Sequence, residues 1–138
     1  MSKVGRYSAQ RRKVKDLGTT ATTITAAQCG TEFLINQNGT ANITHTLPNV
    51  ADAQQGWWCA FTLATAVAHN DADVTIAAEG TIVHGVEGGD ANAPLAGVTN
   101  VLVEGNAAAK GTRVEYWTDG AAWFVTTLAS TDTAITTS

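Results

Sequence analysis

Apolar and polar residues alternate along most of this chain, with the period of two that is typical of half-buried β-strands. The clearest example is 40–47, where Ala41, Ile43 and His45 share one face and threonines dominate the other. The segment 57–64 is the most apolar and alternates in the same way. The pattern predicts about eight strands, at 31–36, 40–47, 57–64, 74–76, 81–84, 98–104, 112–118 and 122–128. No segment predicts a helix.

Turn residues separate these segments. Asn38-Gly39 follows the first predicted strand and Asp119-Gly120 precedes the last one, and both dipeptides are strong signals for a tight hairpin. The segments 49–55 and 85–97 are polar or glycine-rich and predict loops. Short strands with closely spaced turns predict an all-β fold, namely an antiparallel β-sandwich or a jelly-roll-like body.

The length of 138 residues fits one domain with terminal extensions. We expect a basic N-terminal arm and linker over 1–20, the β-sandwich body over 21–129, and a flexible, threonine-rich tail over 130–138. No apolar run approaches the roughly 20 residues of a membrane helix, and no apolar stretch follows the basic N-terminus as in a secretion signal. A soluble product of a cytoplasm is therefore expected.

Charge is divided unequally along the chain. The first fifteen residues carry about +6 and the remainder about −10, although the net charge is only −4. Such a block typically holds nucleic acid, an acidic protein surface or a neighbouring copy, and the alternative is a solvated leader without a partner. The acidic body argues against a nucleic-acid-binding face on the folded part. The predicted binding residues of the arm are Lys3, Arg6, Arg11, Arg12, Lys13 and Lys15.

The sequence contains no strong catalytic or metal-binding pattern. His45, His69 and His84 lack the spacing of a zinc pair, and His45 falls on the apolar face of a strand, where a core or interface position is expected. The acidic clusters at 71–73 and 87–90 match no complete calcium loop and are typical of solvated turns. We therefore expect no metal, no cofactor and no enzyme.

The two cysteines, Cys29 and Cys59, are expected to be free thiols, since a cytoplasmic product rarely keeps a disulfide. The sequence does not exclude a disulfide between them. Nor does it exclude a Cys–His nucleophilic pair, because such partners meet in space and not in sequence.

Large aromatic residues occur as adjacent pairs, which point to opposite faces of a strand. An antiparallel sheet with one solvent-exposed face is expected to carry large apolar rings on its buried side only. Rings on the other side must therefore be covered by something outside the core. The candidates for this cover are another subunit, a ligand and the basic arm, and we expect a subunit interface. The alternative is that both faces are buried within one domain. The candidates are Trp57, Trp58, Tyr116, Trp117, Trp123 and Phe124.

Three short motifs resemble a known class of protein. They are TAAQCGTEF at 25–33, TLP at 46–48, and YWTDG at 116–120 continuing to WFV at 123–125. This series resembles the head decoration (cement) proteins of tailed bacteriophages and related fibre or knob-like domains, with Cys29 in place of a usual Ser and Phe124 in place of a usual Tyr. The basic arm is not part of that pattern.

The resemblance implies a non-catalytic virion protein. Its body would be a β-sandwich, often a homotrimer, attached to the major capsid protein on the capsid surface after assembly in the host cytoplasm. The alternative is a tail-fibre or receptor-binding domain that binds carbohydrate, with Trp58 or Trp117 stacked on a sugar ring. A hydrolase has almost no support from the sequence.

Overall fold

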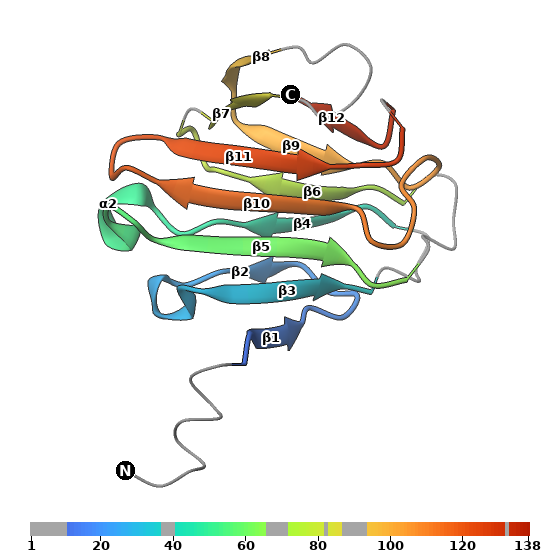
Figure 1. Ribbon diagram of the computed structural model, residues 1–138, viewed down its shortest axis with the longest axis horizontal. Helices are drawn as coiled ribbons and strands as arrows, with labels where there is room; N and C mark the ends of the chain where they lie inside the picture. Colours follow the sequence, from blue (N-terminus) through green and yellow to red (C-terminus); the bar gives the residue numbers. More distant parts are fainter. Residues whose placement is uncertain (1–10, 37–40, 66–71, 82, 87–93, 132) are drawn as a thin grey trace, which may run out of the picture.

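The protein is a sandwich of two β-sheets packed face to face (Figure 1). The computed structural model describes residues 11–36, 41–65, 72–81, 83–86, 94–131 and 133–138. The expected all-β, sandwich-like fold is confirmed.

The larger sheet has seven strands and the smaller has five. In spatial order, the larger comprises β1 (Lys13–Asp16), β3 (Thr31–Ile35), β5 (Trp58–Leu63), β10 (Arg113–Thr118), β11 (Trp123–Leu128), β7 (Val83–Val86) and β8 (Pro94–Val98). The smaller comprises β12 (Ile135–Thr137), β9 (Asn100–Val103), β6 (Val74–Ala77), β4 (Ile43–Thr46) and β2 (Thr22–Thr23). A 3₁₀ turn, η1 (Ala26–Gln28), and a short helix, α2 (Val50–Ala53), lie in the connections.

The chain winds between the two sheets from β1 to β6. Each strand in this part lies in the opposite sheet from the strand before it and pairs in parallel with the strand two positions earlier. Parallel pairing follows from this path, because a chain that crosses to the other sheet and back returns in its original direction. The sheets are therefore mixed, and not antiparallel throughout as expected.

This winding overturns the predicted hairpin at Asn38-Gly39. The strands before and after it, β3 and β4, lie in different sheets and are not paired with each other. The dipeptide itself lies outside the described residues. The prediction inferred strand pairing from a local turn signal. In the structure, each of the two strands packs in a different layer of the core, and so they do not pair.

The second predicted hairpin is confirmed. Strands β10 and β11 pair antiparallel from Arg113↔Leu128 to Thr118↔Trp123, so the connection is the four residues 119–122. The Asp119 carboxylate accepts hydrogen bonds from the backbone N–H groups of Ala121 and Ala122, both at 2.9 Å, and these bonds lower the pKa of Asp119. Gly120 has φ +96°, a backbone conformation that residues other than glycine rarely adopt.

Four other expectations are corrected by burial and backbone pairing. The expected tail contains β12, which pairs with β9, and Ile135 is buried. The expected loops over 85–97 and 49–55 contain β8 and α2. Within the expected arm, residues 13–16 form β1 at the edge of the larger sheet, and Leu17 is buried. Residues 1–10 lie outside the described part.

The core contains a continuous series of aromatic rings. Trp57 and Trp123 meet edge to face at 5.5 Å between centroids, and Tyr116 contacts both Trp123, at 6.2 Å, and Phe61, at 6.1 Å. Their side chains are buried, so a second subunit does not reach Trp57, Tyr116 or Trp123. The prediction of a subunit interface is wrong for these three residues, because the two-layer packing already covers them.

Candidate functional site

The outer face of the larger sheet carries a row of rings. Trp58, Trp117, Phe124 and His84 come from β5, β10, β11 and β7, and each is the register partner of the next. Trp58 is 37% exposed and Trp117 is 44% exposed, the two most open large aromatic side chains in the described residues. We call these four residues the aromatic row.

Contacts on both sides hold the aromatic row in place. Trp117 stacks on Phe124 with 4.6 Å between centroids, and Phe124 lies 5.7 Å from the His84 ring. At the other end, the Trp58 indole lies over Gly30, where an added Cβ would be 3.8 Å from the ring. The Gly30 N–H also donates to the Trp58 carbonyl oxygen at 2.7 Å. Both ends of the aromatic row therefore pack against other residues of the sheet face.

Next to the aromatic row lies a cluster of opposite charges, which we call the charged cluster: Arg12, Glu32, Arg113 and Glu115. Arg113 holds the Glu32 carboxylate in a two-pronged bond, with Nε–Oε1 and Nη2–Oε2 both at 3.1 Å. Arg113 also pairs with Glu115 at 2.8 Å, and Arg12 reaches Glu32 at 3.3 Å. Two guanidinium groups and two carboxylates thus balance one another.

Glu32 is the buried member of the charged cluster, since its side chain is only 7% exposed. Burial raises the pKa of Glu32, but hydrogen bonds from Arg113 and Thr62 and the two guanidinium charges outweigh it, so the pKa lies below its ordinary value. The pKa of Arg113 is raised, mainly by its bond to Glu32. Glu32 and Arg113 therefore stay charged at neutral pH, and their bond fixes Arg113 in position.

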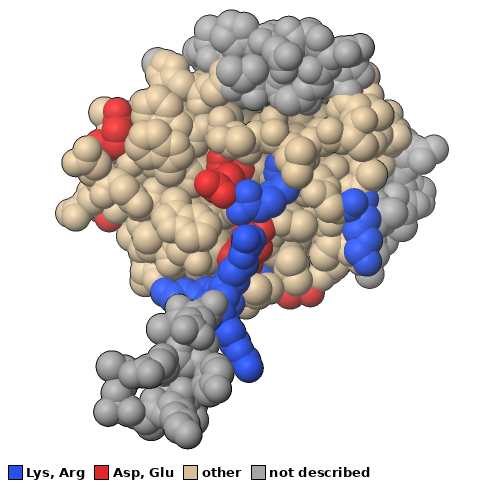
Figure 2. Space-filling view, viewed as in Figure 1, with Lys and Arg blue, Asp and Glu red and all other residues tan. Residues whose placement is uncertain are grey.

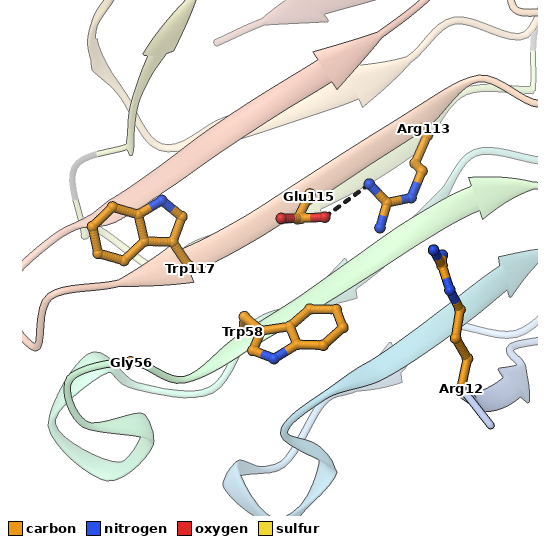
Figure 3. Close-up of a pocket in the computed structure, with 6 residues that line it drawn as sticks. All are labelled: Arg12, Gly56, Trp58, Arg113, Glu115 and Trp117. Carbon is orange, nitrogen blue, oxygen red and sulfur yellow. Dashed lines mark ion pairs between the residues drawn. The ribbon is translucent and has the colours of Figure 1, made fainter. Parts of the chain in front are cut away.

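The aromatic row and the charged cluster share a depression of about 440 Å³, lined by Arg12, Gly56, Trp58, Arg113, Glu115 and Trp117. Figure 3 shows the two indoles at one end, the two guanidinium groups at the other, and the Glu115 carboxylate between them. This volume falls in the range of about 300–1,000 Å³ in which small-molecule sites occur. The combination offers flat apolar surface and directed hydrogen-bonding groups in one place.

The described part of the basic arm lies at the edge of the same sheet. Arg11, Arg12, Lys13 and Lys15 are all exposed, and β1 is attached to β3 by backbone pairing. In Figure 2, Lys and Arg side chains extend from the middle of this face down to that edge. Lys3 and Arg6 lie outside the described residues.

The described residues contain no group of three or more His, Cys, Asp and Glu side chains that could hold a metal ion. His45 is in the core, where burial lowers its pKa, and burial raises the pKa of the Cys59 thiol well above its ordinary value. Cys29 and Cys59 are both free thiols. His69 and the acidic residues Asp71, Glu87 and Asp90 fall outside the described part.

Sequence reasoning identified the rings of this site and Arg12 but missed its other charged residues. Glu32, Arg113 and Glu115 were not singled out, although Arg113 is one of only two basic residues beyond the arm. The alternation in β10 was the available signal, because Arg113, Glu115 and Trp117 lie two residues apart and so share one face. Of the six aromatic candidates, Trp58, Trp117 and Phe124 are the three on the outer face.

No helix in the described ranges is long and apolar enough to cross a membrane. Comparison with known proteins finds no matching family model, no matching curated protein and no matching solved structure.

Proposed function

We propose that this protein is a structural component of a bacteriophage virion, a decoration protein that binds the outer capsid shell and stabilises it. The observation on which the proposal depends is the exposed basic segment at the edge of an otherwise acidic sandwich. Its motifs at 25–33, 46–48 and 116–125 support the same assignment through their resemblance to decoration proteins. In this proposal the protein has no catalytic role.

The basic segment suits attachment because it is fixed to the body. Strand β1 pairs with β3 over four residues, and Arg12 is held by Glu32. Arg11, Lys13 and Lys15 remain exposed for an acidic partner surface, for which we propose the major capsid protein. A fixed set of charges loses less conformational freedom on binding than a free leader does.

Attachment through small charged contacts is stronger when several arms act together. A homotrimer, as in the decoration proteins that the motifs resemble, would bring three basic segments to one capsid site. Once one arm is bound, the others bind at a high effective concentration. The mass of the purified protein by light scattering tests this part separately, and a monomer at all concentrations would contradict it.

A charge reversal that spares the fold tests the attachment. The triple variant Arg11→Glu, Lys13→Glu, Lys15→Glu keeps the backbone pairing of β1 and leaves Arg12 on Glu32. We expect its cosedimentation with empty phage shells to fall roughly tenfold or more at about 0.1 M salt. Binding of the unchanged protein should also weaken between about 0.1 M and 1 M salt, because the Debye length falls from about 10 Å to about 3 Å.

Lys110→Glu is the matched control, since Lys110 is an exposed lysine on the body and lies far along the chain from the arm. It should bind shells as the unchanged protein does. If the triple variant and the Lys110 variant bind equally well, or if salt has no effect, the arm is not the attachment site and the proposal fails.

A further inference from the structure

We propose that the depression between the aromatic row and the charged cluster is a binding site for a neutral carbohydrate chain. This site lies on the body and does not depend on the capsid attachment proposed above. Its surface is exposed in the described structure, and its two parts match the two sides of a sugar ring.

The aromatic end matches the apolar side of a sugar. A pyranose ring presents a face of C–H groups, which packs against the flat face of an indole. Trp58 and Trp117 are direct cross-strand partners, whose Cβ atoms are about 4.5–5.5 Å apart in antiparallel sheets, and both line the depression. Stacking on Phe124 and contact with Gly30 fix the two rings, which reduces the ordering cost of binding.

The charged end matches the hydroxyl groups. A carboxylate accepts hydrogen bonds in pairs and a guanidinium donates them in pairs, and vicinal hydroxyls do both. Glu115 is 39% exposed beside Trp117, and the Arg12 side chain is 71% exposed and makes only one ion pair among the described residues. Both therefore have hydrogen-bonding capacity left for a ligand, whereas Arg113 serves to orient Glu115.

The charge balance indicates a neutral ligand. Each guanidinium group of the charged cluster is paired with a carboxylate, so the cluster as a whole carries no surplus positive charge for a phosphate, a nucleic acid or an acidic sugar.

The direct test is a glycan array followed by calorimetric titration of the full-length protein. The soluble probes are hexamers of neutral sugars: cellohexaose, maltohexaose and chitohexaose, together with any neutral glycan found on the array. We expect binding to at least one neutral glycan. Trp58→Ala and Trp117→Ala should each weaken that binding roughly tenfold or more, as for aromatic anchors. Glu115→Gln should weaken it while leaving the melting temperature nearly unchanged.

Leu128→Ala is the control, since Leu128 is a 67% exposed apolar residue on the same strand as Phe124 but outside the depression. It should bind as the unchanged protein does. The inference is overturned if no neutral glycan binds at millimolar concentration, if only acidic glycans bind, or if Trp117→Ala binds normally. It is also overturned if light scattering shows that Trp117→Ala separates an oligomer, because a second copy then occupies this face. None of these results changes the expectation for the basic arm.

Discussion

Adjacent aromatic residues in this protein differ in what covers them. In the hairpin β10–β11, Tyr116 and Trp123 point inward and are fully buried, while their neighbours Trp117 and Phe124 point outward. The inner rings contact one another edge to face, in the packing typical of a core. The outer rings stack with each other and border a charged depression.

This difference separates stability from function within one pair of strands. Inner positions have no access to a partner, so changes there act on folding. Outer positions contribute little buried area, so changes there act on whatever binds that face. The variants below test this separation, and each has a control on the opposite face or at an exposed position.

The largest loss of stability is expected for Trp123→Ala. The ring is 0% exposed and contacts Trp57 and Tyr116, so its removal leaves a large cavity between the sheets. We expect the free energy of unfolding to fall by roughly 3–5 kcal/mol. Trp117→Ala, in the neighbouring strand but on the outer face, should cost about 1 kcal/mol or less. Urea melts of both variants measure this contrast, and equal costs would show that the two faces are not distinct.

The next largest effect is expected for Arg113→Met. Its loss leaves the buried Glu32 carboxylate with only Arg12 and Thr62 as partners. Removing one partner of a fully buried pair costs about 3–5 kcal/mol, and the remaining partners reduce this to roughly 2–4 kcal/mol. Glu115→Gln, which breaks the more exposed pair of the same arginine, should cost less than about 1 kcal/mol. If the two variants lose equal stability, Glu32 is not the residue that anchors Arg113.

The sequence predicted the two faces well because alternation has a purely local cause. In β5, β10 and β11, the period of two assigns each ring to a face, and burial follows from that assignment. The sequence did not predict which of the two faces would be buried, because burial depends on which face packs against the second sheet. The six rings were therefore taken together as interface candidates, and the structure divides them three and three.

The topology was predicted less well, and for a related reason. Asn38-Gly39 resembles Asp119-Gly120 in sequence, but only the second connects strands that pair with each other. A turn dipeptide specifies local backbone conformation, whereas strand pairing depends on which sheet each strand joins. The charged cluster was missed for the same reason. Arg12 directly precedes β1, Glu32 lies in β3 and Arg113 lies in β10, and only the folded sheet brings these three residues together.

A smaller effect is expected for Gly120→Val in the hairpin connection. Gly120 has φ +96°, and an added Cβ would be 3.5 Å from the Gln55 backbone nitrogen, so space is available and the strain is conformational. We expect a loss of roughly 1–3 kcal/mol in the free energy of unfolding. Gly120→Asn should lose less, because asparagine tolerates positive φ better than a β-branched residue. Unfolding at the same denaturant concentration for both variants would contradict this account.

The smallest effect concerns a polar residue on the inner face of β4. His45 is 1% exposed, and its Nδ1 has no hydrogen-bond partner among the described residues, so burial lowers its pKa from the ordinary 6.5. The folded protein therefore holds His45 neutral, while the unfolded chain takes up a proton once the pH falls below about 6.5. The contribution of neutral His45 to the free energy of unfolding should be complete above that pH and should decrease as the pH falls toward the folded-state pKa.

Urea melts between about pH 7 and pH 5 measure this slope. His45→Leu should remove it, since Ile43 on the same face of β4 shows that the position faces apolar surroundings. His84→Gln is the control on the outer face, because the His84 ring is exposed in the aromatic row, and it should keep the slope of the unchanged protein. Because Glu32 has a pKa below its ordinary value, its contribution is lost only at lower pH and does not enter this window. A slope that persists in His45→Leu and disappears in His84→Gln would place the pH sensitivity on the outer face and contradict the distinction between the two faces.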